Sequence, residues 1–164
     1  MISKIETNTS HKKILLILLI LVTVSISIRL YFLPLETPFK TDAIDYFSFA
    51  FETSKTHQFP SGILKTNDGW PLFLSPIFSI IGQSDMLTLI NAQRITSILF
   101  SSLSIIPVYF LCKKFVSPKF SLIGASLFGF NHKLIENSIL GVTEPLFIFL
   151  IIFMIIFSLE NNKK

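Results

Sequence analysis

Long apolar runs dominate this sequence and limit what it can fold into. The first run, 14–33, supplies about the 20 residues that a helix needs to cross a bilayer. Three later runs, 91–112, 115–131 and 139–159, are also apolar. Since 51% of the residues are hydrophobic and 15% are charged, the chain is too apolar for an ordinary soluble domain. The sequence predicts an all-α integral membrane protein with about four transmembrane helices in a single domain.

The first run is better explained as an uncleaved membrane anchor than as a signal peptide. Its segment 25–27, Ser-Ile-Ser, is a poor cleavage site, and Arg29 follows at once. Arg29 falls near the far end of the span. Because the stem of an arginine is long and apolar, we expect its guanidinium to reach the membrane interface.

A polar, turn-rich loop, 34–90, separates the first two spans. Positions 43, 47, 50 and 54 fall on one helical stripe, which predicts a short amphipathic helix over 43–54 lying on the membrane surface. Asp42 precedes this helix and is placed to cap it. The apolar segment 71–82 is too short to cross a bilayer, so we expect a second surface or re-entrant helix there.

The positions of the basic residues predict the orientation. With four spans, the lysines at 12–13, 113–119 and 163–164 all lie on one side, and basic residues favour the cytoplasm. A fifth span over 71–90 would move the lysines at 113–119 to the outside. We therefore expect a multi-pass protein of the cell membrane with both termini cytoplasmic. The basic clusters are then topology signals, which leaves a nucleic-acid partner without support.

Few residues offer chemistry. There is no glycine-rich phosphate loop, HExxH or GxSxG motif, and the single cysteine, Cys112, excludes an internal disulfide. Two carboxylates, Asp42 and Glu144, are expected at the outer membrane face. They could share a divalent cation, or one could act as a general base on a hydroxyl. The structural alternative is that Asp42 caps a helix and Glu144 is favoured by a helix dipole.

The order of these segments resembles a known family. An outer loop reading TDAIDYFSFAFE is followed by NDGWPLFLSPIFSIIG, by a span ending in YFLCKKF, and by NHKLIENSILGVTEPLFIFLIIF. This order is similar to the N-terminal part of the GT-C membrane glycosyltransferases, which include protein mannosyltransferases and the lipid A aminoarabinose transferase. The matching motifs are Asp42-x-x-x-Tyr46 with Ala50 four residues on, Gly69-Trp70-Pro71 and Thr143-Glu144.

The resemblance implies transfer of a sugar from a polyprenyl- or dolichyl-phosphate donor at the outer membrane face, with inversion at the anomeric carbon. Asp42 would be the base or a metal ligand, with Asp45 as its rival, and Glu144 a second polar wall or ligand. The remaining implied roles are donor-phosphate binding by Arg94 and, more weakly, Lys40, and sugar stacking by Tyr46 and Trp70. Arg94 could instead be an interfacial arginine, and the aromatic residues part of an interfacial belt.

The family carries more spans than this chain shows. The resemblance therefore implies a truncated GT-C-like chain: a fragment, an inactive remnant, or a split product that needs a partner chain for the missing spans. A small non-catalytic membrane subunit is the alternative from another functional class. A transporter is disfavoured, because the ionisable residues gather at span ends and in one loop.

Overall fold

The computed structural model describes residues 2–38, 42–58, 69–82 and 84–161, and within these ranges it is helical and contains no strand. The apolar runs form the longer helices, and Gly82 and Gly141, both at a φ of 76°, mark two helix ends. The helices of the described ranges are α1 (Ile2–Tyr31), α2 (Ala43–Thr56), α3 (Gly69–Ile81), α4 (Met86–Leu103), α5 (Ile105–Cys112), α6 (Pro118–Gly129), α7 (His132–Leu140) and α8 (Glu144–Asn161).

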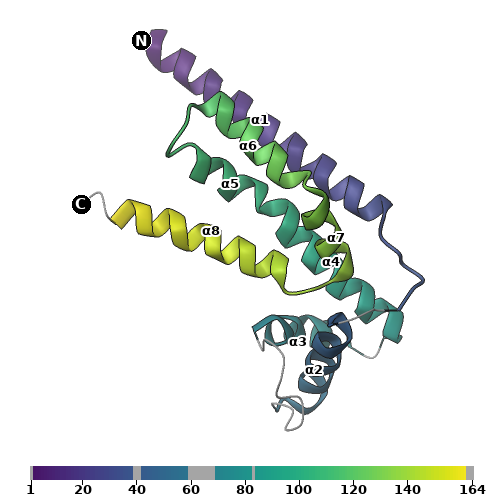
Figure 1. Ribbon diagram of the computed structural model, residues 1–164. Helices are drawn as coiled ribbons and strands as arrows, with labels where there is room; N and C mark the ends of the chain where they lie inside the picture. The colour runs from purple at the N-terminus through teal and green to yellow at the C-terminus, as the bar shows by residue number, and fades with distance from the viewer. Residues whose placement is uncertain (1, 39–41, 59–68, 83, 162–164) are drawn as a thin grey trace.

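The helices form a bundle with a smaller helical pair at one end. Helices α1, α4, α5, α6 and α8 lie along a common direction, and α2 and α3 pack together beyond one end of them (Figure 1). The N-terminus and the C-terminus both lie at the opposite end of the bundle (Figure 1). The chain therefore runs along α1 to the α2–α3 pair and then returns into the bundle, which α4 to α8 complete.

Three segments in the described ranges are long and apolar enough to cross a membrane. They are Lys12–Tyr31, Met86–Cys112 and Glu144–Asn161. The predicted span 115–131 differs, because α6 covers only twelve residues and the chain starts a new helix after Asn131. The Asn131 side chain accepts hydrogen bonds from the backbone N–H groups of Lys133 and Leu134, which starts α7. A helix thus occupies the segment expected to be a polar interruption, and α8 begins at Glu144 rather than at 139.

Small residues let α6 approach its neighbours closely. Ser121, Ala125 and Gly129 recur at a spacing of four residues and are buried. A Cβ atom at Gly129 would lie 2.5 Å from Cδ1 of Ile105 on α5, so only glycine fits there without a shift. Small residues at this spacing are a common basis of helix packing in membranes, where close backbone approach replaces the hydrophobic effect.

Arg29 is fully buried, with an exposed fraction of 0%, so the expectation that it reaches the interface is wrong. Its guanidinium donates to Ser25 on its own helix, from Nη1 to the backbone oxygen at 3.2 Å and to Oγ. It also donates from Nη2 to Oγ of Ser101 on α4 and to the carbonyl of Gly129, both at 3.1 Å, and from Nε to Oγ of Ser138 on α7 at 3.0 Å. The surrounding helices thus supply hydrogen-bond acceptors for the guanidinium, so it does not need to reach water at the membrane interface.

The α2–α3 pair has an apolar core of its own that continues into the bundle. Its buried residues are Ala43, Tyr46, Phe47, Ala50, Trp70, Leu74 and Phe78, and Leu89, Ile90 and Val142 join them from the bundle. Nε1 of Trp70 and Nε2 of Gln93 both donate to the carbonyl oxygen of Gly141, at 3.1 and 2.8 Å. Nε2 of Gln93 also lies 3.3 Å from the carbonyl oxygen of Ala43. The loop between α7 and α8 therefore anchors the pair.

Candidate functional site

An open groove with a volume of about 490 Å³ lies where α2, α3 and the start of α8 meet. We call it the Tyr46–Glu144 groove. It joins three segments that are far apart in the sequence, and Tyr46, Trp70 and Glu144, three of the predicted site residues, all line it. The complete lining is Tyr46, Gly69, Trp70, Thr143, Glu144, Leu146, Phe147 and Leu150.

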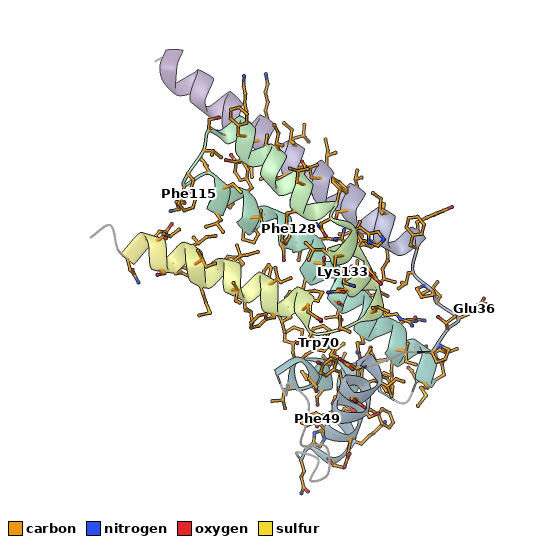
Figure 2. All side chains as sticks on the ribbon, viewed as in Figure 1. Glu36, Phe49, Trp70, Phe115, Phe128 and Lys133 are labelled. Atoms are coloured by element: carbon orange, nitrogen blue, oxygen red, sulfur yellow. The ribbon has the colours of Figure 1, made fainter. Side chains whose placement is uncertain are left out.

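Trp70 forms the covered base of this groove. Figure 2 shows its side chain where the α2–α3 pair meets the bundle, and only 1% of the residue is exposed. The indole is held by the hydrogen bond to Gly141 and by stacking against Phe73, with ring centroids 6.1 Å apart. Its position is thus set by packing, and the stacking of a sugar on its ring stays a prediction.

Asp42 precedes α2 without capping it through its side chain, so the predicted capping bond is wrong. Its backbone oxygen accepts from the N–H of Tyr46 at 3.2 Å, but its carboxylate makes no capping hydrogen bond and is exposed. The reason is the backbone, because φ −57° and ψ −21° are helical, whereas a capping residue is usually extended. Asp85, extended at φ −61° and ψ 155°, does cap α4 by accepting from Thr88. The Asp42 carboxylate is therefore available for another role.

The hydroxyl of Tyr46 interacts electrostatically with carboxylates from two parts of the chain. Burial raises the pKa of the Tyr46 hydroxyl, and the negative charges of Glu144, Asp42 and Asp45 raise this pKa further, in that order. Glu144 begins α8, whereas Asp42 and Asp45 belong to the start of α2, so acidic groups from both helices act on one phenol. A phenol is already protonated at neutral pH, and the raised pKa extends this to more alkaline pH, so Tyr46 can donate a hydrogen bond.

The residues at this site do not form a good set of metal ligands. Within the described ranges, no three His, Cys, Asp or Glu side chains gather where they could hold one ion. Glu144 is the only carboxylate in the lining of the groove, which Asp42 does not join, whereas Ca²⁺ takes six to eight oxygen ligands and Mg²⁺ requires an octahedral set. We therefore assign no chemical step at this groove to a bound cation.

Arg94 does not line the groove, and neither does Asp42. Arg94 is buried on α4, and its Nη1 donates to the carbonyl oxygens of Pro34 at 2.8 Å and Thr37 at 3.0 Å. It thereby holds the segment after α1 against α4, and it is not among the residues that line the groove. Lys40 lies outside the described residues. Their roles toward a donor phosphate remain predictions.

Sequence reasoning missed part of the groove wall. Leu146, Phe147 and Leu150 line the groove from α8, although the sequence shows them only as members of an apolar run. Their spacing from Glu144, which places Phe147 and Leu150 within two turns, was the available signal. Gln93, which anchors the base, was visible as an amide inside a span, and such residues usually face the interior of a bundle.

Comparisons with protein-family models, with curated proteins and with solved structures found no match to this chain.

Proposed function

We propose that this chain is the catalytic N-terminal portion of a GT-C-like membrane glycosyltransferase that uses a polyprenyl-phosphate sugar as donor. One observation carries the proposal: the Tyr46–Glu144 groove gathers residues of three short motifs that are separate in the sequence. Tyr46 follows Asp42 in the first motif, Trp70 belongs to the second, and Glu144 to the third. The α2–α3 pair, which contributes Tyr46, Gly69 and Trp70 to the groove, lies at the end of the bundle opposite to the termini (Figure 1).

The proposed reaction is a displacement at the anomeric carbon of the donor. The Asp42 carboxylate accepts the proton of an acceptor hydroxyl while that oxygen attacks the anomeric carbon. The bond between this carbon and the phosphate oxygen breaks, the polyprenyl phosphate leaves with the electron pair, and the anomeric centre inverts. Tyr46 donates a hydrogen bond and Glu144 accepts one, so that both orient the sugar or the acceptor.

A non-catalytic membrane subunit is the second candidate, and the packing of α8 favours it. Only 11% of the α8 span is buried against the rest of the described chain, compared with 50% of Met86–Cys112. Apolar faces that are this uncovered suit contact with lipid or with helices of a partner chain. A subunit of this kind would not need the Asp42 carboxylate, so the two candidates differ in their response to its removal.

We further propose that α6 and α7 together make one membrane crossing, which gives four crossings and two cytoplasmic termini. The two helices contain 12 and 9 residues, and at about 1.5 Å per residue their summed length is about 30 Å, comparable to the thickness of the hydrocarbon core. The shared location of the termini in Figure 1 fits an even number of crossings. We place this arrangement in the cell membrane, with the polar loop of α2 and α3 outside, because the basic clusters at the other end favour the cytoplasm.

Cysteine labelling tests this topology. In a Cys112→Ser background, Lys55→Cys is expected to react with a membrane-impermeant maleimide added to intact cells, because α2 lies outside. Ser117→Cys, at the start of α6, is expected to react only after the cells are opened. Both positions are exposed in the folded chain, so reactivity reports the side of the membrane. Labelling of Ser117→Cys in intact cells would contradict the four-crossing arrangement.

Donor binding tests the proposed function. The chain has a single tryptophan, so its intrinsic fluorescence reports on the groove base alone. A polyprenyl-phosphate sugar is expected to change the Trp70 emission of the purified chain in detergent, and free polyprenol is not. Phe147→Ala is expected to weaken donor binding roughly tenfold, because it removes an apolar wall of the groove.

Met154→Ala is the matched control for this titration. Met154 lies on the same helix and is 68% exposed, close to the 59% of Phe147, and it is not part of the groove lining. Its substitution should leave donor affinity unchanged. If the donor produces no change in emission, or if both variants bind equally well, the donor does not occupy this groove.

A further inference from the structure

A second and larger cavity lies at the other end of the bundle. It has a volume of about 590 Å³, within the usual range of ligand pockets, and it lies between α5 and α8. We call it the α5–α8 cleft. None of its lining residues belongs to the Tyr46–Glu144 groove. The lining is Ile106, Pro107, Phe110, Lys113, Lys114, Phe153, Ile156, Phe157 and Glu160.

The lining changes from apolar to charged along the bundle. Its apolar residues lie within the candidate spans Met86–Cys112 and Glu144–Asn161. Its charged residues come at the ends of these spans: Lys113 and Lys114 directly follow the first, and Glu160 lies in the last turn of the second. In a membrane, the apolar part is therefore level with acyl chains and the charged part level with headgroups.

The described charged residues at the mouth of the cleft are an ion pair and a further lysine. Nζ of Lys114 lies 2.7 Å from Oε1 of Glu160, so an ion pair connects the turn after α5 with α8. Lys113 also lines the cleft and is exposed, so the described lining holds two lysines and one carboxylate. Two lysines against one carboxylate favour an anionic group at the mouth.

We propose that the α5–α8 cleft binds an anionic phospholipid from the membrane leaflet near the termini. An acyl chain lies along Phe110, Phe153 and Phe157, and the phosphate contacts Lys113 and Lys114. Charge complementarity selects this occupant, because basic pockets between membrane helices at the interface bind acidic headgroups. A helix of another chain would instead cover the two lysines and remove them from water, at a cost that an apolar helix does not offset.

Lipid retention in native mass spectrometry tests the proposal. The full chain is purified in detergent and exposed to phosphatidylglycerol and phosphatidylcholine with identical acyl chains. The chain is expected to retain phosphatidylglycerol preferentially. Lys113→Gln is expected to reduce this preference about fivefold, the contribution of one lysine near an anionic headgroup. Lys119→Gln is the control, since this lysine follows soon after in the chain but does not line the cleft.

A second variant tests the apolar part independently. Ile156→Trp fills the floor of the cleft and is expected to lower retention of both lipids, without changing the preference between them. Equal retention of the two lipids by the unaltered chain would overturn the proposal, as would equal effects of Lys113→Gln and Lys119→Gln. A dimer that forms only when lipid is stripped would overturn it too, by assigning the cleft to a second copy of the chain.

Discussion

Asp42→Asn is expected to lower sugar transfer by about 100- to 10,000-fold, the usual contribution of a general base. The structure indicates that this substitution changes the charge of the side chain and leaves the fold intact. The Asp42 carboxylate is exposed and makes no capping hydrogen bond, so replacing one oxygen with an amide nitrogen removes charge without disturbing α2. Transfer from a radiolabelled polyprenyl-phosphate sugar is measured in membranes that contain the variant as the only copy of this protein. The expression level and thermal stability of the variant are measured in the same membranes.

Asp45→Asn is the matched control for this measurement. Asp45 lies one helical turn along α2, is exposed, and also acts on the pKa of Tyr46, but the proposed resemblance to the GT-C enzymes assigns the base to position 42. Its substitution should change transfer by only a few-fold. Near-normal transfer by Asp42→Asn, with equal protein in the membrane, would exclude Asp42 as the base. It would also favour the non-catalytic subunit, unless Asp45→Asn or Glu144→Gln abolishes transfer.

Arg29→Ala is expected to lower the free energy of unfolding by about 3 kcal/mol or more. The substitution leaves a cavity at a fully buried position, and it removes donors from Ser101, Gly129 and Ser138, which lie on three different helices. Thermal unfolding in detergent, followed by circular dichroism, measures the effect. Arg29→Lys should be destabilised as well, because an ammonium group has three donors and lacks the planar fork that reaches all of these acceptors.

Tyr31→Ala is the control on the same helix. Tyr31 is 83% exposed and lies only two residues further along α1, so its loss should shift the unfolding temperature little. If Arg29→Ala unfolds at the temperature of the unaltered chain, the hydrogen bonds of Arg29 contribute no net stability. The burial of its guanidinium would then need another explanation.

The helical architecture follows from sequence pattern where the pattern is strong. The spans at 14–33, 91–112 and 139–159 each overlap a helix that is long and apolar enough to cross a membrane. The pattern fails between 115 and 144. There the Asn131 side chain caps the start of α7, in a segment that hydropathy presents as an apolar run followed by a polar gap. An average of hydropathy over a window of residues does not detect such local hydrogen bonds.

The candidate site was predictable in part, for a related reason. The motif residues Tyr46, Trp70 and Glu144 do meet in one groove. The environments of Arg29 and Arg94 were not predictable, because both depend on acceptors supplied by distant segments. A sequence shows that an arginine lies in or beside an apolar run, and it does not show which serine or carbonyl oxygen lies within reach.

The carbonyl of Gly141 has a consequence for the order in which the protein is built. Trp70 and Gln93, which hold the α2–α3 pair to the bundle, both bind this oxygen, which lies 71 and 48 residues later in the chain. During synthesis the pair therefore emerges from the ribosome well before its anchor exists. The pair must remain undocked until α7 and the start of α8 are synthesised, so the groove is completed late in biogenesis. Ribosome-stalled chains that end before Gly141 should accordingly carry α2 and α3 undocked.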